Sequence, residues 1–199
     1  EIGLGIPAEP LFRSRARHSL FPAVFKKAGY CVDFLTNQFA MAQTEDMWDF
    51  TGATIFNRHG LSDLQFTHRN PVIFELDGEL LEQLPPTDSL TARPTLLIVH
   101  QRGQHVRYDN RYPKEFAKFT AKDEKTTFGG QTGREMAAHY DNATLYDDYV
   151  VNAVFDHVKD ADAIGLFLSD HGEEVYDWRD TYERTNERDI TPEIAHYQY

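Results

Sequence analysis

The order of apolar and polar segments predicts an α/β fold, in which a mostly parallel sheet is flanked by helices on both faces. Helix-like and strand-like segments alternate along the chain, as they do where parallel strands are joined by helical crossovers. The strand-like segments at residues 95–101 and 164–168 contain unbroken apolar runs, which are typical of strands buried on both faces. Residues 41–87 show no clean period, so we predict no element there.

The first predicted pair of elements is a helix followed by a strand. Ser19 can cap the helix, and Leu20 and Val24 are spaced as on one helical face. Gly29 ends the helix, and the β-forming residues 30–36 then predict a strand.

The second half of the chain predicts a strand, a loop, a helix and a further strand. The strand at 95–101 follows a polar, Pro-rich approach, and the polar, glycine-bearing residues 118–135 predict a loop. A helix is expected over residues 143–162, capped by Asp141 or Asn142. Its apolar face is expected to consist of Leu145, Tyr149, Val150, Ala153, Val154 and Val158.

Composition and charge exclude several classes of protein. Lys and Arg number 20 against 32 Asp and Glu, so the net charge of −12 repels nucleic acid and anionic membrane surfaces. An anionic substrate would need a local counter-charge, and a metal ion is the most compact one. Cys31 is the one cysteine, which excludes an intrachain disulfide and a cysteine-cage zinc site. No apolar run approaches the roughly 18 residues of a membrane span.

The apolar run 164–168 ends abruptly in a polar turn that contains Asp170 and His171. Carboxylate and imidazole groups are both good zinc ligands. Neighbouring side chains of a regular strand point to opposite faces, so both can reach one ion only where the strand breaks, and Gly172 provides that break. The alternative is a helix cap in a surface turn. The residues alone leave both interpretations open.

A basic stretch follows the strand at 95–101, at the strand end where open α/β sheets bind ligands. Arginines there could bind phosphate oxygens, and histidines could give or take a proton. The alternative is a solvated loop whose arginines pair with nearby carboxylates. The residues of this stretch are His100, Arg102, His105, Arg107 and Arg111.

Four segments together resemble the periplasmic phosphoethanolamine transferases that modify bacterial lipopolysaccharide, a family of the alkaline-phosphatase and sulfatase superfamily. The segments read SLFPAVFKKAGYCVDFLTNQ, LLIVHQRGQHVRYDNRYPKEFAKF, YDNATLYDDYVVNAVFDHV and LSDHGEEVYD, in that order. They resemble most the branch that modifies the core sugars. The resemblance covers nearly all of residues 1–199 and implies part of a sulfatase-like catalytic domain.

The resemblance also implies roles for individual residues. Asp170 and His171 take the places of zinc ligands, for one or two ions. His105 takes the place of an active-site histidine that contacts the phosphoryl group or the leaving group, and His196 matches a further histidine of the site. Substrate binding is assigned to Arg102 and Arg107.

The implied reaction moves phosphoethanolamine from phosphatidylethanolamine to lipopolysaccharide through a covalent enzyme intermediate, at the bacterial inner membrane with the catalytic domain in the periplasm. The family's threonine nucleophile, its metal-binding glutamate and its N-terminal membrane helices have no match among these residues. We therefore expect an interior piece of an incomplete domain that is inactive by itself. The alternative is another enzyme of the superfamily, such as a sulfatase, a phosphodiesterase or a phosphoglycerol transferase.

Overall fold

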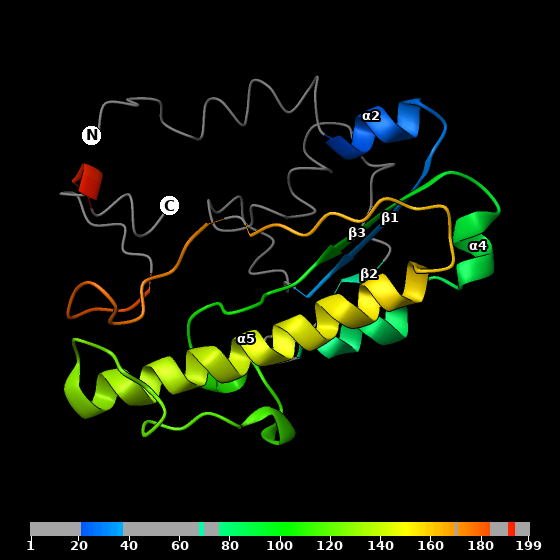
Figure 1. Ribbon diagram of the computed structural model, residues 1–199. Coiled ribbons are helices and arrows are strands. Elements are labelled where there is room, and N and C mark those ends of the chain that lie inside the picture. The colour runs from blue at the N-terminus through cyan, green and yellow to red at the C-terminus, as the bar shows by residue number, and fades with distance from the viewer. Residues whose placement is uncertain (1–20, 38–67, 70–75, 170, 184–190, 194–199) are drawn as a thin grey trace. The chain divides into compact units, whose positions relative to one another are not determined.

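The computed structural model describes residues 21–37, 68–69, 76–169, 171–183 and 191–193 (Figure 1). Contacts divide the chain into two compact units, and we treat each by itself. The sheet unit comprises residues 6–102 and 156–163, and the long-helix unit comprises residues 1–5, 103–155 and 164–199. Within the described ranges, no helix combines the length and apolar character that crossing a membrane requires.

A three-stranded parallel sheet organises the sheet unit. Strand β1 (Cys31–Thr36) lies between β2 (His68–Arg69) and β3 (Thr95–His100), and both pairings are parallel. The register of β1 and β3 runs from Cys31 opposite Thr95 to Thr36 opposite His100. This arrangement confirms the predicted parallel sheet and its strands at 30–36 and 95–101.

Helix α2 (Phe21–Lys27) leads into β1 as the sequence predicts. Gly29 ends the helix with a φ of +89°, a left-handed conformation that glycine adopts without steric cost. The backbone N–H of Tyr30 donates to the Phe25 carbonyl oxygen at 3.1 Å, and the rings of Phe25 and Tyr30 meet edge to face at 5.0 Å. These contacts turn the chain from the helix into the strand. The proposed cap, Ser19, lies outside the described residues.

Two short helices, η1 (Asp77–Gln83) and α4 (Thr87–Thr91), precede β3. Leu80 of η1 is 1% exposed and anchors that helix in the interior. The loop between the helices is tied to His157, whose Nε2 lies 2.8 Å from the Pro85 carbonyl oxygen. All of η1 falls within the stretch that shows no period, so hydrophobic spacing did not reveal it.

Helix α5 (Gly130–Val158) dominates the long-helix unit and follows the short helices η2 (Tyr108–Asn110) and η3 (Lys114–Phe116). It begins well before the predicted helix, so the loop prediction for 118–135 is wrong from Gly130 onward. The glycines there suggested a loop, but Gly133 is buried, and a Cβ at this position would lie 2.4 Å from the Phe128 carbonyl oxygen. A close approach of the backbone, not a loop, requires this glycine.

The buried face of α5 differs in part from the predicted one. Val150 is buried, as expected, but Tyr149 is 50% exposed and Tyr146 lies inside in its place. The two rings stack on each other at 6.1 Å, so the outer tyrosine covers the inner one. Apolar spacing alone did not distinguish which of the two faces inward.

The predicted helix cap at Asp141 or Asn142 is wrong, because both residues lie inside α5. Asn142 is 2% exposed, and its Oδ1 accepts the backbone N–H groups of Lys118 and Phe119 at 2.7 and 2.8 Å. Its Nδ2 donates to the Phe119 carbonyl oxygen at 2.9 Å. The Asn142 amide therefore forms hydrogen bonds with the backbone of a loop that packs against α5. It does not cap a helix end.

The prediction of a buried strand at 164–168 is also wrong. These residues belong to none of the strands that the structure describes, and Ile164, Leu166 and Leu168 are 94, 84 and 75% exposed. A strand forms only where a neighbouring strand completes its hydrogen bonds, and the described sheet consists of β1, β2 and β3. The apolar character of residues 164–168 predicted burial, but a strand also requires a neighbouring strand to pair with.

Candidate functional site

A buried polar cluster joins the carboxyl ends of β1 and β3. Thr36 and His100 end the two strands opposite each other, and Thr36 Oγ1 lies 2.8 Å from His100 Nδ1. The next residue, Asn37, donates its backbone N–H to the His100 carbonyl oxygen at 3.0 Å. Its side-chain amide donates to Asp77 Oδ1 at 2.7 Å, and the backbone N–H of Arg102 donates to the same oxygen at 2.9 Å. We call these five residues the strand-end cluster.

Asp77 is the shared acceptor of the strand-end cluster and is 4% exposed. Sequence reasoning missed it because the segment before β3 shows no period. Asn37 could have been found, since β1 also ends in polar residues, which is the criterion that identified the tip of β3. Burial lowers the pKa of Arg102, and the nearby Asp77 carboxylate opposes this effect. The guanidinium stays charged and is held at the strand end by its own backbone.

The loop after β3 presents His105 and Arg107 to solvent, as both side chains are exposed. Arg107 has a φ of 65° and starts η2. Arg111 holds this loop from inside: it is 7% exposed, and it donates from Nε to the His105 carbonyl oxygen at 3.0 Å and from Nη2 to the Val106 carbonyl oxygen at 3.2 Å. Neither interpretation of the basic stretch predicted this role for Arg111.

The polar turn after residues 164–168 holds the His171 ring against its own backbone. Its Nδ1 lies 2.7 Å from the Gly172 carbonyl oxygen, and Ser169 Oγ donates to the His171 carbonyl oxygen at 2.6 Å. Because a carbonyl oxygen accepts only, this contact makes Nδ1 the donor. A metal ion would then be bound through Nε2, which keeps His171 a candidate for the predicted zinc site.

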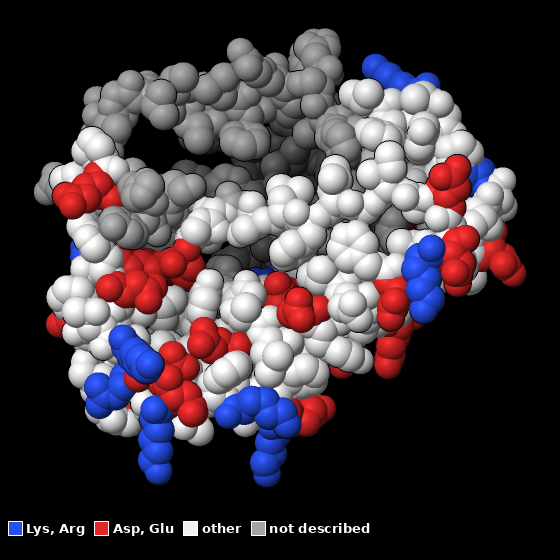
Figure 2. All heavy atoms as spheres, viewed as in Figure 1, with Lys and Arg blue, Asp and Glu red and all other residues white. Residues whose placement is uncertain are grey.

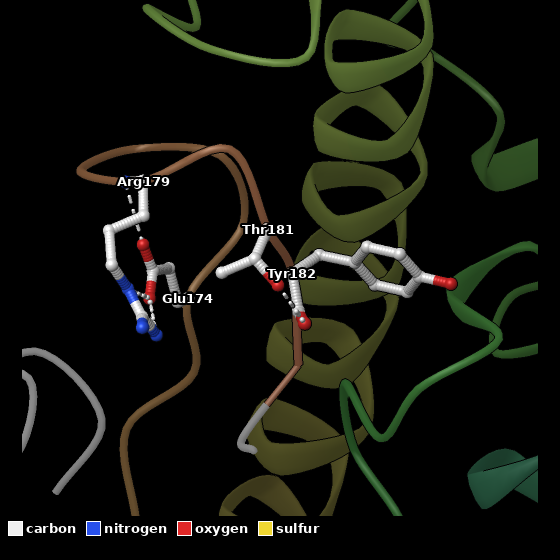
Figure 3. A network of polar contacts seen from close by, with 4 residues as sticks. All are labelled: Glu174, Arg179, Thr181 and Tyr182. Carbon is white, nitrogen blue, oxygen red and sulfur yellow. Dashed lines mark hydrogen bonds and ion pairs between the residues drawn. The ribbon is translucent and has the colours of Figure 1, made fainter. Parts of the chain in front are cut away.

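Two acidic residues behind this turn are held by buried hydrogen bonds. The Tyr108 hydroxyl donates to Glu173 Oε1 at 2.6 Å, and burial raises the pKa of Tyr108, with a further contribution from Glu173. Glu174 is 2% exposed and accepts from the backbone N–H, Nε and Nη2 of Arg179 at 2.8, 3.0 and 2.8 Å. Figure 3 shows the Arg179 side chain folded over the Glu174 carboxylate, beside the chain at Thr181.

The structure places only some of the predicted site residues. Those described in the long-helix unit are His105, Arg107 and His171, whereas Arg102 belongs to the sheet unit. Asp170 and His196 lie outside the described residues. In the part of the chain that is described, no group of three or more His, Cys, Asp and Glu residues is arranged to hold a metal ion. The ligand set therefore stays a prediction.

The visible face of the molecule carries many acidic side chains. Figure 2 shows Asp and Glu side chains across the visible face, while Lys and Arg side chains project mostly from its edges. This distribution agrees with the net charge of −12. An anionic phosphodiester would be attracted by local positive charge, not by the whole surface.

Comparisons with known proteins agree on one family. The sulfatase family model matches residues 6–197. The phosphoethanolamine transferase EptC of Escherichia coli O18:K1:H7 is 34% identical over 161 residues, and the phosphoethanolamine transferase CptA of Salmonella typhimurium is 35% identical over 161 residues. Each alignment covers 77% of this chain and 26% of the relative, so the chain spans about a quarter of the length of these relatives.

A solved structure shows the same fold. The crystal structure of the C-terminal periplasmic domain of EptC from Escherichia coli in complex with Zn matches with a TM-score of 0.65 and 30% identity. The match covers 84% of this chain and 47% of that domain. The likeness assigns the described sheet and helices to the alkaline-phosphatase-like fold.

Proposed function

Because this chain belongs to the sulfatase family, we propose that it forms part of a metal-dependent phosphoethanolamine transferase. The observation that carries the proposal is the contact of His171 Nδ1 with the Gly172 carbonyl oxygen, which makes Nε2 the nitrogen through which this ring would bind zinc. The names of the relatives support the transferred group, and the Zn complex of the solved domain supports the metal. Because the relatives are much longer, we propose that the activity belongs to a longer protein.

We assign zinc binding, for one or two ions, to Asp170 and His171 together with residues outside this chain. Bound zinc would supply a Lewis acid that neutralises charge on the phosphoryl oxygens and lowers the pKa of a nucleophilic hydroxyl. The Gly172 carbonyl oxygen, which accepts from His171 Nδ1, would orient the ring toward the ion. Ser169 fixes the backbone of the same turn.

The proposed reaction has two phosphoryl-transfer steps. A threonine hydroxyl from outside this chain attacks the phosphorus of phosphatidylethanolamine, and the bond from phosphorus to the diacylglycerol oxygen breaks. His105, exposed on its loop, gives the departing oxygen a proton, while Arg102 and Arg107 bind the phosphoryl oxygens. An oxygen of a lipopolysaccharide hydroxyl or phosphate then attacks the phosphorus, the bond from phosphorus to the threonine oxygen breaks, and the threonine regains a proton. We place this reaction at the bacterial inner membrane, on its periplasmic side.

The metal assignment is tested by Asp170→Ala and His171→Ala in the complete protein, with the exposed Asp180→Ala as the matched control. Both ligand variants should lose zinc and transferase activity, and the control should keep both. Elemental analysis measures zinc, and release of diacylglycerol from a fluorescent phosphatidylethanolamine measures activity. Zinc at the level of the unmodified protein in both ligand variants would contradict the assignment.

The role of His105 is tested by His105→Ala. Zinc content and folding should be unchanged, because the side chain is exposed, while turnover falls by about 10²–10⁴-fold, as for the loss of a general acid. Unchanged turnover would show that His105 is an ordinary solvated loop residue with no role in catalysis.

The runner-up function is a different hydrolase or transferase of the superfamily, which the family match by itself does not distinguish. Aryl sulfate and bis-aryl phosphate substrates separate the two. Hydrolysis of either substrate faster than release of diacylglycerol would favour the runner-up. We expect the 199-residue chain alone to be inactive in all of these assays.

A further inference from the structure

One partly buried hydrogen bond connects the loop of His105 to the turn of His171. The Tyr108 hydroxyl donates to Glu173 Oε1 at 2.6 Å across 65 positions of sequence. Tyr108 follows His105 in its loop, and Glu173 follows His171 in its turn. All four residues belong to the long-helix unit, so this connection lies within one compact body.

Tyr108 is held rigidly in the core of that unit. It is fully buried, with an exposed fraction of 0%, and packs with Ala137, Ala143 and Val175. The rings of Tyr140 and Tyr182 meet it edge to face at 5.2 and 6.5 Å. A ring enclosed in this way cannot swing to another partner, so the direction of its hydroxyl is fixed by the core.

The other end of the loop is equally constrained. Arg111 donates to the carbonyl oxygens of His105 and Val106, and the N–H of Arg111 itself donates to the Tyr108 carbonyl oxygen at 3.0 Å. Residues 105–111 therefore form a small closed piece of backbone, and a displacement of Tyr108 displaces His105 as well.

Glu173 lies in a turn that follows a segment exposed at Leu168 and Ser169. Val175, two residues further on, packs in the same buried cluster as Tyr108. The hydrogen bond from Tyr108 joins the Glu173 side chain itself to this core. The burial that surrounds the hydroxyl raises the pKa of Tyr108, so it remains a donor throughout the physiological pH range.

We propose that Tyr108 is a positioning residue, whose hydrogen bond to Glu173 sets the place of His171 relative to His105. This inference rests on the proposed function, which assigns zinc to the turn and phosphoryl chemistry to His105. A displacement of about 1 Å between catalytic groups can cost about 10²-fold in rate. Groups that orient metal ligands from behind typically change metal affinity or activity by about 10–100-fold.

The test uses the complete protein with Tyr108→Phe, which keeps the packed ring and removes only the hydroxyl. We expect zinc affinity, measured by competition with a chromophoric chelator, to fall by about 10–100-fold, and kcat to fall more than KM rises. The matched control is Tyr149→Phe, because that tyrosine is 50% exposed on α5, and it should change neither quantity. A zinc affinity within twofold of the unmodified protein would overturn the proposal.

The bond can also be removed from its other side. Glu173→Ala should weaken zinc binding as Tyr108→Phe does, while Glu173→Gln keeps an oxygen that accepts from the hydroxyl and should restore most of the affinity. The double variant Tyr108→Phe with Glu173→Ala should bind zinc no more weakly than the weaker single variant, since both remove one bond. Additive losses would show that the two residues act separately, and would refute the positioning role of their hydrogen bond. These variants keep the test decisive if Tyr108→Phe does not fold.

The outcomes for the positioning role of Tyr108 and for the proposed function are distinguishable. If Asp170→Ala and His171→Ala both keep their zinc, the metal assignment fails, whatever Tyr108→Phe does. If Asp170→Ala loses zinc and Tyr108→Phe keeps full affinity and turnover, the metal assignment stands and only the positioning role fails.

Discussion

Replacing Asp77 with alanine should destabilise the sheet unit strongly. The Asp77 carboxylate is 4% exposed and accepts from Asn37 Nδ2 at 2.7 Å and from the Arg102 N–H at 2.9 Å. Hydrogen bonds to a charged acceptor contribute about 1.5–3 kcal/mol each, so losing both costs about 3–6 kcal/mol. Removing the buried carboxylate also removes its desolvation cost. We therefore expect a loss near the lower end, about 3 kcal/mol in the free energy of unfolding.

Urea unfolding followed by circular dichroism measures this loss. With a slope of about 1–3 kcal/mol per molar urea, the midpoint should fall by about 1 M or more, with the slope unchanged. The matched control is Glu79→Ala, because Glu79 is exposed in the same helix η1, and its free energy should change by less than about 0.5 kcal/mol. If Asp77→Ala lowered the midpoint no more than Glu79→Ala does, the strand-end cluster would not stabilise the sheet as argued.

Three further perturbations test the long-helix unit. Asn142→Ala should cost about 2–4 kcal/mol in the free energy of unfolding, because it leaves buried backbone groups without their partner, while the exposed Asn152→Ala should cost little; calorimetry compares the two. Arg179→Ala should cost about 3–5 kcal/mol by leaving the buried Glu174 carboxylate uncompensated, and a loss below about 1 kcal/mol would contradict the structure. Burial raises the pKa of Asp141 above 3.8, so its contribution to stability is present at low pH and is lost as the pH rises. Asp141→Asn should therefore raise the melting temperature at pH 7, by an amount that shrinks toward pH 3.8, and a gain independent of pH would refute this reasoning.

The elements that the sequence predicted correctly are those with a local signal. Gly29 ends α2 because a left-handed turn is needed there, and the runs of β-forming residues in β1 and β3 pair in parallel as predicted. In each case the residues that form the element also carry the information that locates it. The composition of each segment is enough to locate these elements, although β1 and β3 still complete each other's hydrogen bonds.

The features that sequence reasoning missed depend on partners far along the chain. Asp77 is a single acidic residue in a stretch without a period, and only the folded sheet brings it to the strand ends. In the sequence, Arg111 resembles any other surface arginine. Only the structure shows that its guanidinium donates to the His105 carbonyl oxygen. Residues 164–168 show the opposite error, since their apolar character suggested a buried strand that the described sheet does not contain.

The exposed run at 164–168 has a consequence for how the molecule behaves in concentrated solution. Side chains with high β-propensity that face water without a charge among them are a template for pairing with another chain. The sequence brackets this run with acidic residues, Asp160 and Asp162 before it and Asp170 after it. Charges placed in this way act as gatekeepers, because stacking identical segments would bring like charges together.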